Sequence, residues 1–164
     1  MNKKTILVVE DEMGPRESLK MILGAHYQIE LAENGLKAME ILERQSIDGI
    51  TMDLRMPGPS GIDALKQIKK RWPAIQVLVI TGYATLKTAL DAIRHGAFNY
   101  LQKPFDIDEL VDVMQKMVAK KNQMEGVGGL NLPEREYPVA SPSPPTVKSA
   151  AFAFSDFENI HEAD

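Results

Sequence analysis

Residues 5–12 read Thr-Ile-Leu-Val-Val-Glu-Asp-Glu, a short apolar run that ends in three consecutive acidic residues. The run is rich in β-branched residues and is too short for a typical helix, so it predicts a buried strand. A strand that is apolar at every position is typical of a parallel sheet covered on both faces. The pattern that decides the fold is therefore a buried strand whose carboxyl end presents acidic side chains.

Four further apolar runs follow, and segments of helical period separate them. This alternation indicates an α/β fold, in which a parallel sheet is packed between helices on both faces. The predicted strands are residues 5–9, 27–31, 49–52, 76–80 and 99–102. The predicted helices are residues 15–23, 36–44, 62–71, 86–94 and 107–122.

The chain changes character after Met124, where glycines and then prolines amid Ser and Thr replace the periodic pattern. We therefore predict a domain over residues 1–124 and a Gly/Pro/Ser-rich tail over residues 125–164. The tail carries two basic and seven acidic residues, against 17 basic and 16 acidic residues in the domain, so we expect it to be solvated and disordered. Its apolar-acidic end, residues 151–160, is either a short docking motif or an end without a function.

The composition excludes several classes of protein. The chain has no cysteine, which excludes a disulfide framework, a thiolate metal site and a cysteine nucleophile, and which fits a cytoplasmic location. The apolar run near the N-terminus is too short for a signal-peptide core or a membrane span, so we expect no membrane contact. Neither segment has a basic nucleic-acid footprint, so direct nucleic-acid binding is not expected.

Chemistry-bearing residues follow four of the five predicted strands. Ligands of an open parallel sheet bind beyond the carboxyl ends of its strands, so these residues are considered together. They are Glu10 and Asp11 after the first strand, Asp53 after the third, Thr81 after the fourth and Lys103 after the fifth. We expect three carboxylates, a hydroxyl and an ammonium at one rim of the sheet.

Carboxylates this close repel one another and raise one another's pKa unless a cation neutralises them. Glu10, Asp11 and Asp53 therefore predict a hard divalent ion, and oxygen-only ligands suit Mg²⁺. A carboxylate can also act as a nucleophile and form an aspartyl phosphate, provided that the phosphoryl oxygens are neutralised. Lys103, as a point charge, and Thr81, as a hydroxyl donor, are candidates for that role.

Each of these residues has an ordinary interpretation when it is taken singly. Asp53 could cap a strand end, and Lys103 could be a solvated lysine. Tyr100 could be a half-buried strand aromatic. The joint pattern favours a phosphorylatable site.

Four blocks of the sequence resemble the receiver domains of bacterial response regulators, most of all those of the nitrogen-regulator class. The blocks are Ile6-Leu7-Val8-Val9-Glu10-Asp11-Glu12, Met52-Asp53-Leu54-Arg55-Met56-Pro57-Gly58, Val79-Ile80-Thr81-Gly82-Tyr83-Ala84 and Gly96-Ala97-Phe98-Asn99-Tyr100-Leu101-Gln102-Lys103-Pro104-Phe105. The resemblance covers residues 4–122. It implies a flavodoxin-like, doubly wound sheet of five parallel strands in the order 2-1-3-4-5, with five helices.

By this resemblance Asp53 is the phosphoacceptor and Mg²⁺ is the cofactor. The resemblance implies that Asp11, Asp53 and the backbone carbonyl of Arg55 hold the ion, with Glu10 bound through water. It also implies a cis peptide bond before Pro104.

The resemblance further implies a switch. Thr81 and Lys103 would contact the phosphoryl group, and the ring of Tyr100 would turn inward when Thr81 moves toward the phosphate. The face built from the fourth helix, fifth strand and fifth helix would then change its affinity for partners. Because this face carries charges of both signs, it would also permit a homodimer.

Two positions depart from what the resemblance leads us to expect. The loop after the acceptor reads Pro59-Ser60-Gly61, where many relatives have Asp-Gly. Gly61 is retained, and Ser60 can cap the next helix. Thr51 places a hydroxyl in a strand that is usually apolar, and we assign it no role.

The main interpretation is a stand-alone signalling switch, not a turnover enzyme. A histidine kinase or phosphotransfer protein would donate to Asp53, and the domain itself would carry out phosphotransfer and autodephosphorylation. The sequence does not identify the downstream protein. Two alternatives stay open: the N-terminal receiver of a larger transcription activator, and a receiver-like protein-binding module that signals through its tail.

Overall fold

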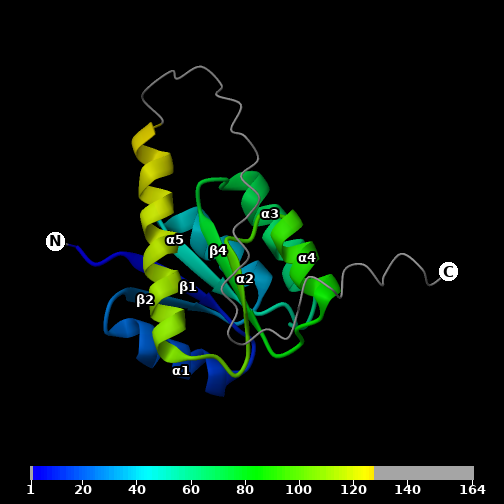
Figure 1. The fold of residues 1–164 in the computed structure, drawn as a ribbon. Coiled ribbons are helices and arrows are strands. Elements are labelled where there is room, and N and C mark those ends of the chain that lie inside the picture. The colour runs from blue at the N-terminus through cyan, green and yellow to red at the C-terminus, as the bar shows by residue number, and fades with distance from the viewer. Residues whose placement is uncertain (1, 128–164) are drawn as a thin grey trace. The chain divides into compact units, whose positions relative to one another are not determined.

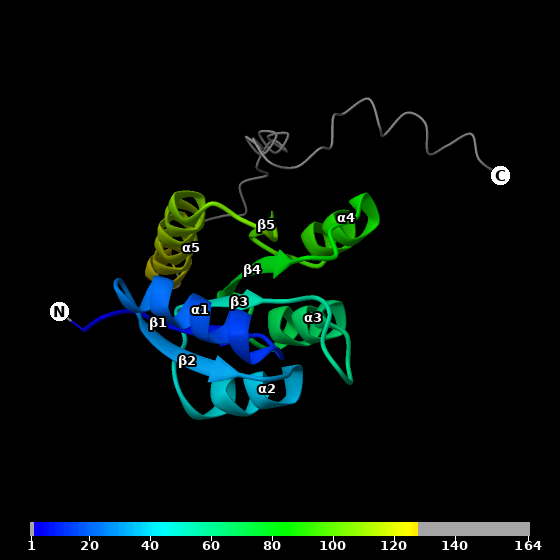
Figure 2. The same cartoon turned by 90° about the horizontal axis from the view of Figure 1, so that it is seen from below.

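The computed structural model describes residues 2–127, which build one parallel sheet and the helices around it (Figure 1). The strands are β1 (Thr5–Val9), β2 (Gln28–Ala32), β3 (Gly49–Met52), β4 (Gln76–Thr81) and β5 (Asn99–Gln102). The helices are α1 (Met13–Gly24), α2 (Gly35–Arg44), α3 (Gly61–Arg71), α4 (Leu86–Arg94) and α5 (Ile107–Val127). The strands follow the order β2-β1-β3-β4-β5 across the sheet (Figure 2), which confirms the predicted fold class.

Two hydrophobic cores hold the sheet between its helices. Side chains of a strand alternate between the two faces, so neighbouring residues of β1 enter different cores. Ile6 and Val8 pack with residues of α1 and α5, whereas Leu7 and Val9 pack with residues of α2 and α3. No helix within residues 2–127 has both the length and the apolar character that a bilayer crossing requires.

The boundaries of β2 and α5 differ from the prediction. β2 begins at Gln28 because this residue pairs with Thr5 of β1, while Tyr27 before it is buried in the core beside α1 and α5. α5 continues to Val127, past its predicted end at residue 122 and past the predicted domain boundary at residue 124. The rest of the predicted tail, including residues 151–160, lies outside the described residues.

The extra length of α5 comes from contacts at the amino end of the sheet. The Lys121 side chain is only 4% exposed and lies 2.8 Å from the carboxylate of Glu125 and 3.5 Å from that of Asp48. The Met124 sulfur accepts a hydrogen bond from the side-chain amide of Gln76 at 3.3 Å. The last turns of the helix are therefore fixed by tertiary contacts, which helical periodicity does not reveal.

Side chains cap the starts of α3 and α5, and the predicted Ser60 cap is confirmed. Asp106 accepts hydrogen bonds from the backbone N–H groups of Asp108 and Glu109 at 2.8 and 3.3 Å, at the start of α5. Ser60 accepts one from the backbone of Asp63 at 3.2 Å, at the start of α3. Each cap satisfies N–H groups that have no partner within the helix.

Candidate functional site

The carboxyl ends of four strands bring the predicted site residues together. The backbone ladder continues one residue past β3 and one past β5: Asp53 N–H donates to the Val9 carbonyl at 3.1 Å, and Lys103 N–H donates to the Thr81 carbonyl at 2.9 Å. Glu10 N–H donates to the Ala32 carbonyl at 3.0 Å in the same way. The positions of these residues are therefore set by the sheet itself.

The side chain of Lys103 joins two buried carboxylates. Its Nζ lies 2.6 Å from Glu10 Oε2 and 2.9 Å from Asp53 Oδ2. The Glu10 and Asp53 side chains are 2% and 9% exposed, whereas Lys103 is 23% exposed. One ammonium thus faces two carboxylates, so the buried site carries more negative charge than its lysine can neutralise.

Burial and the paired charges shift the pKa of Glu10 and of Lys103. Burial raises the pKa of Glu10, and the hydrogen bond and positive charge of Lys103 offset that rise only in part. Burial alone would lower the pKa of Lys103, but its hydrogen bonds to Glu10 and Asp53 outweigh burial and raise it. Both residues therefore hold their protons more tightly than in water, as expected where a further cation would be stabilised.

The second oxygen of the Asp53 carboxylate also has donors. Asp53 Oδ1 accepts from the backbone N–H of Arg55 at 2.9 Å and from the Thr81 hydroxyl at 3.2 Å. The loop after Asp53 is held close to α3, because a Cβ on Gly61 would lie 2.5 Å from Leu54 Cα and 2.6 Å from the Asp53 carbonyl oxygen. Only glycine fits there without moving the backbone of the acceptor.

The side chain of the third predicted carboxylate, Asp11, makes no ion pair or hydrogen bond with this cluster within residues 2–127. Within residues 2–127 no three carboxylates, histidines or cysteines gather closely enough to hold a metal ion. The loop that carries Asp11 is instead fixed through its backbone: Arg16 donates to the carbonyls of Glu10 and Asp11 at 2.9 and 3.1 Å. The roles of Asp11 and of the Arg55 carbonyl as metal ligands stay predictions. Sequence reasoning missed Arg16, because nothing marks an arginine in a helix as a carbonyl donor.

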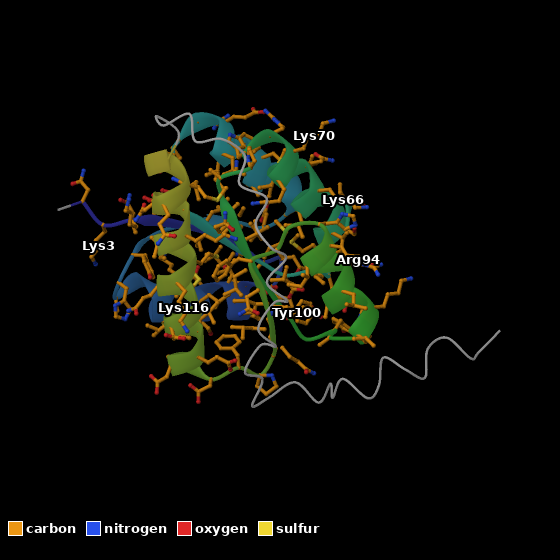
Figure 3. All side chains as sticks on the ribbon, turned by 45° about the horizontal axis from the view of Figure 1, so that its top comes forward. Lys3, Lys66, Lys70, Arg94, Tyr100 and Lys116 are labelled. Atoms are coloured by element: carbon orange, nitrogen blue, oxygen red, sulfur yellow. The ribbon has the colours of Figure 1, made fainter. Side chains whose placement is uncertain are left out.

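Tyr100 lies half-buried on β5, and Figure 3 labels it together with Arg94 at the end of α4. Its hydroxyl is 3.0 Å from the hydroxyl of Thr88 on α4. Burial raises the pKa of Tyr100, and the negative charge of Asp53 adds to this rise while the Thr88 hydrogen bond opposes it. The inward turn of its ring stays a prediction. Thr88 was missed because a threonine in a first helical turn signals only a cap.

A cation–π contact joins the two loops beside the acceptor. The Arg55 guanidinium, from the loop after β3, lies 3.7 Å from the ring centre of Tyr83, which follows β4. The Tyr83 side chain is 59% exposed. The predicted cis peptide bond between Lys103 and Pro104 is confirmed in the third loop of this rim.

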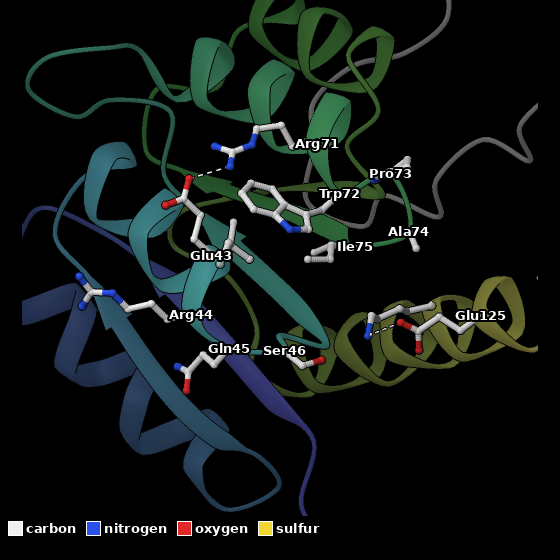
Figure 4. Close-up of a pocket in the computed structure, with 12 residues that line it drawn as sticks. Glu43, Arg44, Gln45, Ser46, Arg71, Trp72, Pro73, Ala74, Ile75 and Glu125 are labelled. Atoms are coloured by element: carbon white, nitrogen blue, oxygen red, sulfur yellow. Dashed lines mark hydrogen bonds and ion pairs between the residues drawn. The ribbon is translucent and has the colours of Figure 1, made fainter.

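An apolar hollow of about 350 Å³ opens beside Lys103, between α1 and the start of α5. Its other lining residues are Pro15, Ser18, Leu19, Ile22, Pro104, Phe105 and Ile107. A second hollow, of about 540 Å³, lies beside the C-terminal ends of α2 and α3 and the last turns of α5 (Figure 4). Four of its charged side chains are paired, Arg71 with Glu43 at 2.6 Å and Lys121 with Glu125, and it contains none of the predicted site residues.

Comparison with known proteins gives the same assignment as the geometry. Residues 6–115 match the family model of the response regulator receiver domain. The chain belongs to the response-regulator receiver family. It is thus a receiver domain of the two-component type, a family of phosphorylation-dependent switches whose members interact with histidine kinases and bind Mg²⁺ at the phosphorylation site.

Individual relatives of the receiver are transcriptional regulators. It is 36% identical over 126 residues to the DNA-binding transcriptional regulator NtrC of Escherichia coli K12, an alignment that covers 76% of this chain and 27% of NtrC. It is 38% identical over 121 residues to the transcriptional regulatory protein ZraR of the same strain, covering 73% and 27%. The chain thus spans about a quarter of the length of these curated relatives.

Solved structures show the same fold. A response regulator receiver domain protein from Clostridium thermocellum superposes with a TM-score of 0.70 at 31% identity, covering 74% of this chain and 98% of that one. The response regulator TrrA from Thermotoga maritima, solved in complex with Mg²⁺–BeF, superposes with a TM-score of 0.64 at 34% identity, covering 70% and 98%.

Proposed function

We propose that Asp53 of this receiver accepts a phosphoryl group from a histidine kinase or phosphotransfer protein. The observation that carries the proposal is the Lys103 ammonium held between the buried carboxylates of Glu10 and Asp53. In the transfer, a carboxylate oxygen of Asp53 forms a bond to phosphorus while the bond from phosphorus to the donor imidazole breaks. The reaction consumes one phosphodonor for each receiver that is modified. It therefore switches the receiver to its phosphorylated state and is not turnover of a substrate.

Residues around Asp53 are suited to stabilise the transferred group. Phosphoryl transfer depends on positioned donors, because charge is spread over the equatorial oxygens in the transition state. Lys103 supplies a mobile positive charge, Thr81 a hydroxyl, and Arg55 a backbone N–H beside the acceptor. The same donors would hold the phosphoryl group of the product until water removes it, which gives the domain its autodephosphorylation.

The oxygen donors at the rim also suit Mg²⁺. Asp53, Asp11 and the Arg55 carbonyl would hold the ion, with Glu10 acting through water. The support is chemical: two buried carboxylates share one ammonium, and burial raises the pKa of Glu10. When bound, Mg²⁺ would neutralise charge on the phosphoryl oxygens.

The phosphodonor would dock on the apolar hollow beside Lys103. This hollow opens next to the acceptor rim, and its lining residue Ile107 is 54% exposed. A donor imidazole must come within bonding distance of Asp53, so its protein has to cover this rim. The cysteine-free composition is consistent with exchange in the cytoplasm.

The output would pass through the face of α4, β5 and α5. Tyr100 lies on this face, and the negative charge of Asp53 adds to the rise in its pKa that burial causes. Movement of Thr81 toward the phosphoryl group would draw the Tyr100 ring inward and change the affinity of the face for a downstream protein or for a second receiver. Two alternatives for the output remain proposals as well: a tail that binds protein, and a larger activator.

The larger activator is favoured by one observation. NtrC and ZraR are about four times longer than the part this chain matches, and NtrC is named as a DNA-binding regulator. If this chain is the receiver of such an activator, DNA binding would belong to other domains, since residues 1–124 carry a net charge of only +1. Sequencing of the complete reading frame distinguishes a larger activator from a stand-alone receiver.

The experiment for the acceptor uses beryllofluoride as a phosphoryl mimic. Two-dimensional NMR spectra of the wild type and Asp53→Asn are compared with and without Mg²⁺ and beryllofluoride. We expect shifts around Asp53, Thr81 and Tyr100 in the wild type only. A folded wild type without shifts would contradict phosphoryl capture, and a folded Asp53→Ala variant that accepted phosphate at the full level would contradict the choice of Asp53.

A further inference from the structure

The hydroxyl of Thr88 lies where the loop after β4, the first turn of α4 and Tyr100 on β5 meet. Its Oγ1 is 3.0 Å from the Tyr100 hydroxyl and accepts a hydrogen bond from the Thr85 backbone N–H at 3.0 Å. It is also 3.0 Å from the Thr85 carbonyl oxygen and 3.3 Å from that of Tyr83, either of which can accept its proton. The Thr85 hydroxyl also donates to Thr88 Oγ1 at 3.1 Å. A hydroxyl has one donor and two acceptor positions, so these contacts exceed its capacity and compete for it.

A chain of hydrogen bonds connects this hydroxyl to the acceptor carboxylate. Asp53 Oδ1 accepts from the Thr81 hydroxyl at 3.2 Å, and the Thr81 oxygen in turn accepts from the Tyr83 backbone N–H at 3.2 Å. The carbonyl of Tyr83 faces the Thr88 hydroxyl at 3.3 Å. A shift of the Thr81 hydroxyl therefore acts on the loop residue that contacts Thr88.

Little buried surface fixes α4 in place. Of its nine residues only Ala92 is buried, and Ile93 is 49% exposed. Elements with few buried contacts move at low free-energy cost. The first turn of α4 is held by a reciprocal cap between Thr85 and Thr88, so the Thr88 hydroxyl fixes both the start of the helix and the Tyr100 hydroxyl.

From these contacts we propose that Thr88 is a latch: its hydroxyl holds Tyr100 in the described position, and phosphoryl capture at Asp53 has to break this hydrogen bond. The proposal rests on the proposed function and adds a residue of α4 to it. When the Thr81 hydroxyl moves to donate to a phosphoryl oxygen, its own oxygen moves away from the Tyr83 N–H, the loop shifts, and Thr88 separates from Tyr100. A variant without the Thr88 hydroxyl has no such hydrogen bond to break, so phosphoryl capture becomes more favourable.

A capping role alone would explain only part of the geometry. It accounts for the bonds between Thr85 and Thr88, but it does not involve Tyr100. Glutamate or glutamine is the usual partner in such a cap, whereas threonine is shorter and branched at Cβ. Both roles predict that loss of the hydroxyl weakens α4, so only a measurement of coupling to Tyr100 separates them.

The test measures the affinity of the full chain for beryllofluoride in Mg²⁺ by NMR titration. Four proteins are compared: the wild type, Thr88→Val, Tyr100→Phe and the double variant. One neutral hydrogen bond corresponds to roughly a fivefold change in an equilibrium constant. We expect each single variant to bind roughly fivefold more tightly, and the double variant no more tightly than either, because both changes remove the same bond.

Two control variants separate the latch from the cap. Thr88→Ser keeps the hydroxyl and should restore wild-type affinity. Thr85→Val weakens the cap without removing the Thr88 hydroxyl, so its effect should add to that of Tyr100→Phe. Should Thr88→Val not fold, Thr88→Ala removes the same hydroxyl with a better helix former.

Unchanged or weaker affinity in Thr88→Val or Thr88→Ala would overturn the latch, as would effects of these variants that add fully to those of Tyr100→Phe. A folded wild type that binds no beryllofluoride would instead overturn phosphoryl capture itself. The two failures are therefore distinguishable.

Discussion

Two lysines, one at each end of the sheet, lie between pairs of carboxylates. At the carboxyl end, Lys103 contacts Glu10 and Asp53, which are both almost fully buried. At the amino end, Lys121 contacts Asp48 and Glu125; the lysine itself is buried, but Glu125 is 53% exposed. Lys4 and the Thr5 N–H also contact Asp48 in the second group, and Lys121 fixes α5. The first group has excess buried charge and only one ammonium, an arrangement suited to chemistry.

The largest expected effect breaks the carboxyl-end group. Lys103→Met removes the only side-chain cation that contacts Asp53 within residues 2–127, so the rate of phosphorylation by a small phosphodonor such as phosphoramidate should fall by about 100-fold. Stability should also fall, because two buried carboxylates lose their partner. Added Mg²⁺ should restore part of the melting temperature. A variant phosphorylated at the wild-type rate would remove Lys103 from the site.

Gly61→Ala tests whether the acceptor loop needs its close approach to α3. A Cβ at this position would overlap the backbone of Asp53 and Leu54, so the loop has to move. We expect about a tenfold lower phosphorylation rate and a loss of about 1–3 kcal/mol of stability, measured by phosphodonor kinetics and urea unfolding. Gly126→Ala in α5, with open space around its Cβ, is the control: it should leave the phosphorylation rate unchanged and should not lower stability, because alanine is the better helix former. Equal behaviour of the two variants would contradict a strained acceptor loop.

Lys121→Met tests whether the lysine at the amino end of the sheet contributes to stability alone. We expect a loss of about 2 kcal/mol in the free energy of unfolding, less than for a fully buried pair because Glu125 is half exposed. The phosphorylation rate should stay within about twofold of the wild type, since the change lies at the opposite end of the sheet. Urea unfolding and phosphodonor kinetics on the same protein measure both. A large loss of rate without loss of stability would show that the two lysines are not functionally distinct.

The smallest expected effect is on β3, the strand that joins Asp48 to Asp53. Thr51 is 1% exposed, and its hydroxyl has no hydrogen-bond partner within residues 2–127. Thr51→Val keeps the shape and removes the unsatisfied group, so it should stabilise the domain by about 1 kcal/mol. Thr51→Ser, which keeps the hydroxyl and loses the methyl, should destabilise it. A valine variant less stable than the wild type would indicate that the hydroxyl has a partner.

The sequence was sufficient for the fold and for most of the site, because both depend on local patterns. Runs such as residues 5–9 show their burial directly, and parallel strands place their carboxyl ends side by side, which brought Glu10, Asp53, Thr81 and Lys103 to one rim. The contact of Lys103 with both carboxylates follows from that placement.

What the sequence did not reveal depends on side-chain direction. Glu10 is in direct contact with Lys103, whereas the role of its neighbour Asp11 as a metal ligand stays a prediction. Lys121 is a charged residue at a buried position of α5, so the apolar periodicity does not extend to it. The predicted helix therefore ended at residue 122, whereas α5 continues to Val127. Arg16 donates to a backbone carbonyl, and Thr88 contacts the Tyr100 hydroxyl. No regular spacing in the sequence predicts contacts of these kinds.

The position of the one tryptophan has a practical consequence. Trp72 ends α3 and lines the hollow beside the last turns of α5, with the Arg71 guanidinium 4.4 Å from its ring centre. The acceptor rim lies at the other end of the strands. Intrinsic fluorescence of this indole should therefore follow unfolding of the amino end while remaining nearly silent to events at Asp53. The protein thus contains an optical probe of its stability that is separate from its signalling state.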